Sequence, residues 1–196
     1  MPKRTSAIIL ASSSPRRREF LRQLGILFEV VAPAIDEKPD KGESPARFAR
    51  RVAVDKARKV AEKVGRNRTV IAADTIVVLG DRILGKPKDA ADAKRMLRAL
   101  SGRWHEVITG VCVMSRGRVR SFVTGTKVQF KKLNPREINF YVRSGEPMDK
   151  AGAYAIQGIG GFMVRGIRGS YSNVVGLPVA ELVEVLKTCS PGTGPF

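Results

Sequence analysis

The sequence of 196 residues predicts an α/β fold with a mixed sheet, in a single two-lobed domain. Two observations favour this fold class. Short apolar runs typical of buried strands alternate with amphipathic stretches of helical spacing. Serine followed by proline, a signal for the start of a helix, occurs after the first apolar run and again at 44–45. No linker, internal repeat or low-complexity tract interrupts the chain, so we expect one domain over 1–196.

The first half of the chain supplies strands and helices in alternation. Residues 7–11 predict a short buried strand, and a helix capped by Ser14 follows as far as about Leu24. A second strand is expected at 28–32, followed by a polar loop. The helix that begins at Pro45 carries an apolar stripe on a basic surface: Phe48, Val52, Ala57, Val60, Ala61 and Val64. Residues 69–84 predict two strands joined by a tight turn at Gly80-Asp81.

The second half predicts a further hairpin and three helices. Asp89 caps a helix with four inward residues, Ala93, Met96, Leu97 and Leu100. Residues 105–130 form a hairpin that turns at Arg116-Gly117, and Asn134-Pro135 opens a short helix ending at Gly145. The glycine-rich stretch 158–170 contains a possible strand. The last helix buries Val179, Leu182, Val183 and Leu186 before a frayed tail at 190–196.

The charge balance favours an anionic partner. Lysine and arginine number 36 against 18 acidic residues, which gives a net charge of +18 and a pI near 10.7. Such a surplus suits nucleic acid or phosphorylated small molecules, and the alternative is a solvated basic surface. No nucleic-acid-binding motif is present, and the few aromatic residues do not interleave with the basic runs. We therefore do not expect nucleic acid to be the partner.

The chain has no recognisable membrane or export signal. No run reaches the 18 apolar residues of a membrane span, and the N-terminal apolar run is too short for a signal peptide. Cys112 and Cys189 lack CxxC spacing, so neither a disulfide framework nor a zinc site is indicated. We expect a cytoplasmic protein without a membrane partner.

Several familiar catalytic motifs are absent. The sequence has no P-loop, and the glycines at 158, 160 and 161 do not complete a dinucleotide fingerprint. His105 is the only histidine, and Thr109 stands where a zinc protease would need a second one. We expect His105 at a strand edge with no catalytic role. Hydrolytic chemistry in this chain would therefore depend on carboxylates, lysines, arginines and a metal ion.

The loop after the first strand is a candidate anion site. The residues beside the N-terminus of the first helix are Ser12, Ser13, Ser14, Arg16 and Arg17. Backbone N–H groups, hydroxyls and guanidinium groups that converge in this way can bind a polyphosphate. The alternative is a capped helix with solvated arginines, and this stretch alone leaves both open.

Acidic residues in two other loops complete a possible hydrolytic site. The polar loop after the second strand offers Asp36, Glu37 and Asp40, and Asp74 follows an apolar run. Carboxylates at strand ends are good ligands for Mg²⁺, and Lys86 can add a point charge for a phosphate. Exposed loop acids are common, so each signal is weak alone. Together they describe an anion grip beside an acidic metal site, as phosphoanhydride hydrolysis requires.

Several long stretches resemble the Maf family of nucleotide pyrophosphatases over about residues 7–186. In chain order they are LASSSPRRREFLRQLGI, AIDE, AADTIVVLGDRILGKPKDAADAKRMLRALSGRWHEVITGV, DKAGAYAIQGIGG and GSYSNVVGLPVAEL. The resemblance implies the α/β fold of the inosine-triphosphate pyrophosphatases, with a cleft between two lobes. It also implies hydrolysis of a nucleoside triphosphate to a monophosphate and diphosphate with Mg²⁺ or Mn²⁺, and suggests a homodimer.

The resemblance also assigns roles and a substrate. The catalytic residues fall on Asp74, Glu37 and Lys86, and we expect Glu37 and Asp74 to bind the metal. The specificity residues fall on Arg16, Thr75 and Gln157, and further substrate-binding residues on Ser12, Arg17, Asp149 and Lys150. The first loop departs from the family at Ser13, where glycine is common.

Gln157 and its surroundings favour the branch that hydrolyses dTTP and UTP, with a possible role in clearing modified pyrimidine nucleotides. The branch that acts on 7-methyl-GTP carries a glutamate at that position, and this substrate is one alternative. A nucleotide- or nucleic-acid-binding regulator of cell division is another.

Overall fold

The computed structural model describes residues 8–65 and 67–189. Ala7 and the expected frayed tail at 190–196 lie outside the described residues. The element order begins β1 (Ile8–Ala11), α1 (Pro15–Gln23), β2 (Phe28–Val30), α2 (Pro45–Val64), β3 (Thr69–Leu79), β4 (Arg82–Leu84) and α3 (Ala90–Leu100). It continues with β5 (Trp104–Ser115), β6 (Arg118–Phe130), α4 (Pro135–Arg143), η1 (Glu146–Asp149), η2 (Ala151–Ala153), η3 (Gly158–Met163), β7 (Val164–Arg168), α5 (Tyr171–Val175) and α6 (Val179–Cys189).

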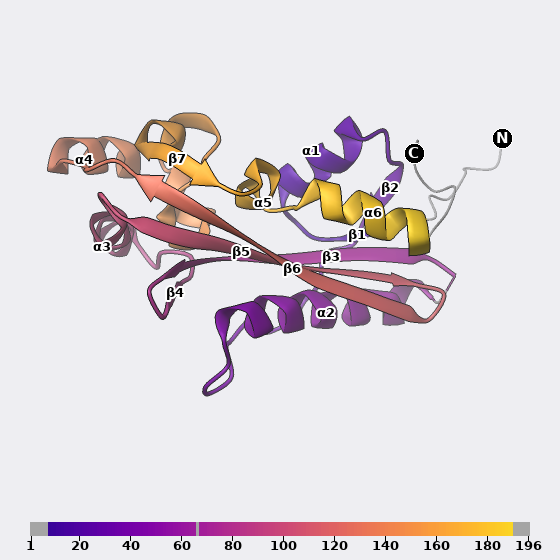
Figure 1. Cartoon of the computed structure of the whole chain (residues 1–196). Coiled ribbons are helices and arrows are strands. Elements are labelled where there is room, and N and C mark those ends of the chain that lie inside the picture. The colour runs from indigo at the N-terminus through magenta and orange to yellow at the C-terminus, as the bar shows by residue number, and fades with distance from the viewer. Residues whose placement is uncertain (1–7, 66, 190–196) are drawn as a thin grey trace. The chain divides into compact units, whose positions relative to one another are not determined.

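The strands form one mixed sheet (Figure 1). Their order is β2-β1-β3-β5-β6-β7, with β4 paired to β3. β1 runs parallel to both β2 and β3, whereas β4 and β7 are antiparallel to β3 and β6. The predicted α/β class with a mixed sheet is confirmed. No helix among the described residues is both long and apolar enough to cross a bilayer.

The chain divides into two compact units. Unit 1 comprises Met1–Asp74, Thr109–Val123 and Gly176–Phe196, and unit 2 comprises Thr75–Ile108 and Thr124–Val175. Each unit has apolar clusters of its own. That the whole chain acts as one domain stays a prediction.

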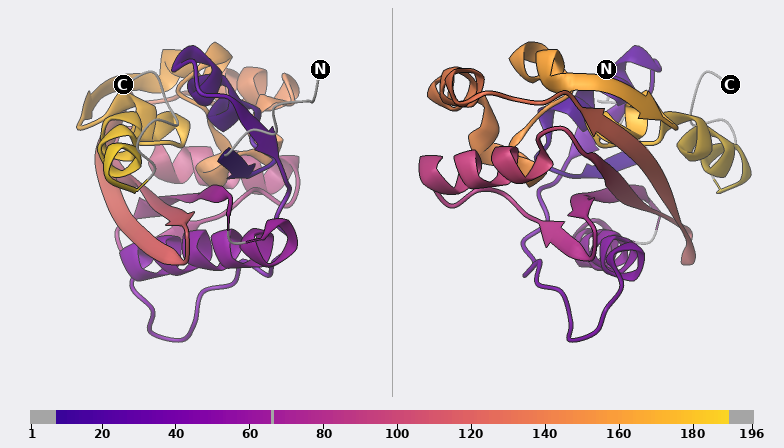
Figure 2. Two further views of the ribbon diagram at one scale, coloured as in Figure 1. Left: turned by 90° about the vertical axis from the view of Figure 1, so that its right-hand side faces the viewer. Right: turned by 60° about the vertical axis from the view of Figure 1, so that its left-hand side comes forward.

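In unit 1, helices cover both faces of the strands. α2 packs on one face through Ala53, Ala57 and Val60, which meet alternate residues of β1 and β3. α1 and α6 pack on the opposite face, where Leu21 and Leu182 join the cluster (Figures 1 and 2). The apolar stripe predicted on the long helix is therefore the face that builds this layer.

α2 approaches the backbone of β5 at a glycine. A Cβ atom on Gly110 would lie 2.3 Å from the carbonyl oxygen of Ala49 and 2.6 Å from the amide nitrogen of Arg50. Real Cβ atoms do not approach other heavy atoms so closely. Only a glycine at this position allows the helix to lie where it does.

Unit 2 buries a single large cluster under α3 and α4. Ala93, Met96, Leu97 and Leu100, the inward residues predicted for α3, all belong to it. The side chain of Asp89 accepts a hydrogen bond from the backbone of Asp92, as expected for a cap. Asn134 and Glu137 form a reciprocal capping box at the start of α4.

Most predicted elements are confirmed, with local differences. The turn between β5 and β6 has positive φ at Arg116 and Gly117, and a strand, β7, lies within the glycine-rich stretch. In α6, Val185 rather than the predicted Val183 packs against the core, beside Leu182 and Leu186. The apolar face of this helix is therefore rotated from the predicted one.

Candidate active site

Two carboxylates of unit 1 converge on one lysine. Nζ of Lys56 lies 2.7 Å from Oδ1 of Asp74 and 2.7 Å from Oε1 of Glu37. Lys56 and Asp74 are buried, with 7% and 6% of their surface exposed, while the side chain of Glu37 is 49% exposed. A buried ion pair thus meets a carboxylate that is open to solvent.

The local sequence explains why these groups meet. Asp74 follows Val70 and Ala72 at a spacing of two along β3, and both of those residues face α2. Lys56 lies three residues after Ala53 on α2, which places it on the helix face toward the strand. Lys56, on the buried face of α2, therefore lies opposite Asp74 of β3.

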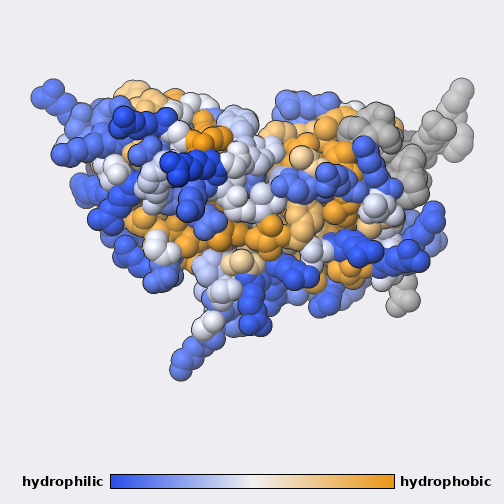
Figure 3. Space-filling model, viewed as in Figure 1, coloured by the Kyte–Doolittle hydropathy of each residue, from blue (hydrophilic) through white to orange (hydrophobic). Residues whose placement is uncertain are grey.

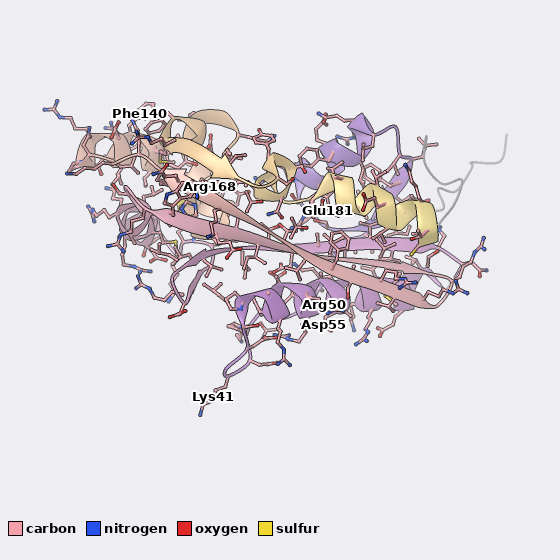
Figure 4. The ribbon with its side chains drawn as sticks, viewed as in Figure 1. Lys41, Arg50, Asp55, Phe140, Arg168 and Glu181 are labelled. Carbon is pink, nitrogen blue, oxygen red and sulfur yellow. The ribbon has the colours of Figure 1, made fainter. Side chains whose placement is uncertain are left out.

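The loop that carries Glu37 is fastened to α2. Arg51 donates from Nε and Nη2 to the two oxygens of Glu43, over 2.8 and 2.7 Å, and from Nη2 to the carbonyl oxygen of Lys38. Hydrogen bonding to Arg51 lowers the pKa of Glu43 to about 2. Lys41 lies at the tip of this loop, which extends away from α2 as a hydrophilic protrusion (Figures 2, 3 and 4).

Arg17 and Ser12 form a buried network at the end of β1. Arg17 donates from Nε to the carbonyl oxygen of Gly176 over 2.8 Å and from Nη1 to that of Ala73 over 2.8 Å. Nη1 also lies 3.2 Å from Oγ of Ser12. Burial lowers the pKa of Arg17, and the nearby Asp74 carboxylate opposes this shift. Arg17 therefore joins three segments of unit 1 around Ser12, and Arg16, the neighbouring residue, is half-buried.

The expected cap of α1 is wrong in its detail. The helix begins at Pro15 as predicted, but the side chain of Ser14 makes no capping hydrogen bond. Instead the backbone N–H of Ser14 donates to Oγ of Ser12 over 3.2 Å. Oγ of Ser12 therefore accepts hydrogen bonds from the backbone of Ser14 and from Arg17, and these bonds fix the loop at residues 12–14.

The remaining predicted residues belong to unit 2. Lys86 is exposed, and the carbonyl oxygen of its neighbour Gly85 accepts a hydrogen bond from the backbone of Gly152 over 3.0 Å. This contact brings the Lys86 segment beside the one that carries Asp149 and Lys150, whose side chains form an ion pair. Gln157 is exposed immediately before η3. Thr75, the first residue of this unit, is partly buried in β3.

The donor set suits a hard cation only in part. No group of three or more histidine, cysteine or acidic side chains able to hold a metal occurs among residues 8–65 and 67–189. Glu37 and Asp74 supply two carboxylates that approach the same nitrogen atom. Mg²⁺ is commonly bound by one or two carboxylates together with substrate phosphates and water. The pair therefore fits a cation that is completed by a phosphorylated substrate.

His105, for which we expected no catalytic role, is buried in unit 2. It lies in β5, an interior strand rather than the expected edge, and only 4% of its surface is exposed. Its Nε2 is 2.7 Å from the hydroxyl of Tyr154, and within the described part of the chain its buried Nδ1 has no partner. Burial lowers the pKa of His105 to about 4.

Sequence reasoning missed Lys56 and Arg51. Lys56 lies within the apolar stripe of α2, among Ala53, Ala57 and Val60. A charged residue on such a stripe is a signal for a buried partner, and this signal was available in the sequence. Arg51 gave only the signal of Asp55 four residues later on the same helix, because its other carboxylate partners, Asp40 and Glu43, lie in a loop without periodicity.

Comparisons with known proteins show the family of this chain. A family model described as "Maf-like protein" matches residues 7–189. A dTTP/UTP pyrophosphatase of Anaeromyxobacter dehalogenans (strain 2CP-C) is 54% identical over 184 residues, covering 92% of this chain and 92% of that protein. Those of Vibrio cholerae and Myxococcus xanthus are each 52% identical, covering 92% of this chain and 97% and 91% of theirs.

A solved structure of the Staphylococcus aureus Ham1 protein is also similar to part of the chain. It has a TM-score of 0.43 and 17% identity, and the match covers 63% of this chain and 71% of that one.

Proposed function

This chain belongs to the Maf family, and we propose that it is a nucleoside triphosphate pyrophosphatase that hydrolyses dTTP and UTP to the monophosphate and diphosphate. The observation that carries the proposal is its 52–54% identity to several dTTP/UTP pyrophosphatases over almost their whole length. The geometry of unit 1 supports it independently, because Asp74 and Glu37 meet at Lys56 and supply two carboxylates of the kind that bind a divalent cation.

Asp74 is the proposed catalytic carboxylate. Cleavage between the α and β phosphates needs a water in line with the leaving diphosphate. Asp74 orients that water, and Lys56 holds the carboxylate in place from α2. Orientation of the water is the proposed contribution of this carboxylate.

A divalent cation is the proposed cofactor, with Glu37 and Asp74 as its protein ligands. When bound, it would lower the pKa of coordinated water and neutralise phosphate charge. The family and the paired carboxylates support this assignment. A homodimer, implied by the resemblance, and a cytoplasmic location, expected from the sequence, remain predictions.

The basic residues have different proposed roles. Arg16 is proposed to bind phosphate and to contribute to specificity, whereas Arg17 positions Ser12, because its Nε and Nη1 are already bonded within unit 1. In unit 2, Lys86 and Lys150 are proposed to stabilise phosphate charge, with Asp149 paired to Lys150. Thr75 and Gln157 are proposed to contribute to the choice of nucleotide.

The test is a product assay on the purified protein. Diphosphate and orthophosphate are measured separately with dTTP, UTP, 5-methyl-UTP, dCTP, ATP and 7-methyl-GTP, each with Mg²⁺, Mn²⁺ or EDTA. We expect diphosphate from dTTP and UTP and none in EDTA. The D74N variant, purified in parallel, controls for a contaminating phosphatase. Orthophosphate as the first product would overturn the proposed reaction, and full activity in EDTA would overturn the proposed cofactor.

A further inference from the structure

Two linked side chains of unit 2, Glu146 and Tyr141, hold the two ends of the loop that carries Gln157. Oε2 of Glu146 accepts a hydrogen bond from the backbone N–H of Ile159, and Oε1 accepts one from Gly160, both over 3.1 Å. The hydroxyl of Tyr141 donates to Oε1 of Glu146 over 2.9 Å and accepts from the backbone N–H of Ala155 over 3.1 Å. We call these two side chains and their bonds the Glu146–Tyr141 clamp.

The clamp is anchored in the core. Tyr141 is fully buried in the unit 2 cluster, which fixes the position of its hydroxyl. Its ring also lies edge-on to Phe162, with ring centroids 6.4 Å apart. Burial raises the pKa of Tyr141, so the hydroxyl keeps its proton and can donate to Glu146.

The glycines of the loop are explained by this close approach. Gly158 has a φ of +68°, and a Cβ atom there would lie 2.8 Å from Oε2 of Glu146. A Cβ atom on Gly160 would lie 2.3 Å from the carbonyl oxygen of Ala155 and 2.7 Å from the Tyr141 hydroxyl. The glycine pattern that does not complete a dinucleotide fingerprint thus has another purpose. It lets the loop backbone reach the clamp.

Gln157 lies at the exposed middle of this loop, between the bonded residues Ala155 and Ile159. Glu146 is also the first residue of η1, which ends at Asp149 and leads directly to Lys150. The clamp therefore ties together two segments that carry proposed substrate-binding residues.

We infer that Glu146 and Tyr141 are positioning residues that set nucleotide selectivity by fixing the loop of Gln157. The inference rests on the proposed function. Thymine and uracil present an N–H donor beside carbonyl acceptors, whereas cytosine presents the opposite pattern at the same edge. A glutamine amide can serve either pattern by turning over. The Gln157 side chain distinguishes thymine and uracil from cytosine only if the backbone of its loop is fixed in one position.

The test compares the Y141F and E146Q variants with wild type on dTTP and dCTP. Phenylalanine keeps the ring but leaves the Ala155 amide without its acceptor, and glutamine keeps the shape of Glu146 but loses the carboxylate. We expect the dTTP to dCTP ratio of kcat/KM to fall about tenfold in each, through the KM for dTTP, because contacts made before the transition state act on KM.

A double-mutant cycle with Q157A separates positioning from general damage. If the clamp acts through Gln157, adding Y141F or E146Q to Q157A causes little further loss of selectivity. E137Q is the matched control, because Glu137 also accepts a backbone and a side-chain hydrogen bond in unit 2 but makes neither with the loop. It should keep the wild-type ratio.

The outcomes are distinguishable. Wild-type protein without activity on dTTP and UTP overturns the proposed function, and the inference with it. Active wild type with additive losses in the cycle, or with equal losses on both nucleotides, overturns the inference alone. If Y141F does not fold, the E146Q arm decides.

Discussion

The ammonium group of Lys56 donates to the carboxylate of Asp74 over 2.7 Å, and both side chains are buried. The bond joins the middle of α2 to β3 inside unit 1. A buried charge without a partner is costly, whereas a paired one is tolerated. The two residues are thus mutually dependent for stability, although only Asp74 is a proposed catalytic residue.

Replacing Lys56 with methionine should destabilise the protein by about 3 kcal/mol, because it leaves the Asp74 carboxylate buried without its partner. Urea unfolding at neutral pH measures the change. Lys59→Met is the matched control on the same helix. Lys59 has an exposed partner, Glu62, at 3.9 Å, and its removal should cost less than about 1 kcal/mol. Equal losses in the two variants would contradict the importance of the buried pair.

Replacing Asp74 with asparagine should lower kcat on dTTP at least about 100-fold. The variant should be less stable but still fold, because Lys56 keeps Glu37 as a partner. The shape is preserved, while the charge that orients water and binds the metal is lost. Steady-state kinetics with circular dichroism as a check on folding gives the measurement. Asp36→Asn, an exposed acid paired with Lys38, should be unaffected. A folded D74N variant with normal turnover would move the catalytic role to another acid, Glu37 first.

Replacing Gln157 with glutamate should lower kcat/KM for dTTP and UTP at least about tenfold, or about 1.4 kcal/mol. An ionised carboxylate only accepts hydrogen bonds, so it opposes the pyrimidine carbonyls. Activity on 7-methyl-GTP should rise relative to dTTP. Both ratios are measured in wild type and variant. Unchanged ratios would show that Gln157 does not select the base.

The stability of the protein should fall as the pH drops below about 6.5, because of His105. Its pKa is about 4 in the folded state, below the ordinary value of 6.5, so the unfolded chain binds the proton more tightly. The contribution is therefore complete above pH 6.5 and is lost as the pH falls toward 4. The stability lost should amount to about 1.4 kcal/mol at pH 5.5.

Urea unfolding at pH 7.5 and 5.5 checks this expectation. His105 is the only histidine of the chain. A His105→Gln variant should lose most of the difference between the two pH values. The same difference in the variant would assign the effect to carboxylates instead.

The sequence was sufficient for most of the elements, and it indicated Glu37 and Asp74, which the structure brings to one lysine. Caps and periodicity located the helices, because a cap such as Asp89 and a stripe such as that of α3 are local properties. The buried role of Arg17 was not predictable. Its acceptors are carbonyl groups at positions 73 and 176, and any residue supplies a carbonyl. A hydrogen bond from a side chain to a distant backbone carbonyl therefore cannot be predicted from the residue type at the acceptor position.

The role of the glycines in the loop of Gln157 was not predictable for the same reason. Their spacing does not match the dinucleotide fingerprint. In the structure, Gly158 and Gly160 allow the carboxylate of Glu146 and the hydroxyl of Tyr141 to approach the loop backbone. Glycine shows where a backbone must be approached closely, but it does not show what approaches. The partner becomes visible only when the fold brings Tyr141 and Glu146 to the loop.

Gly110 has an electrostatic consequence, although it carries no side chain. Ala49, which touches the strand at this glycine, lies seven residues before Lys56, about two turns along the same face of α2. The distance between α2 and β5 at Gly110 therefore influences the distance between the ammonium group of Lys56 and the carboxylate of Asp74 on β3. A methyl group at position 110 would alter charge separation rather than only packing. The strength of the Lys56–Asp74 ion pair thus depends partly on the absence of a Cβ atom at Gly110.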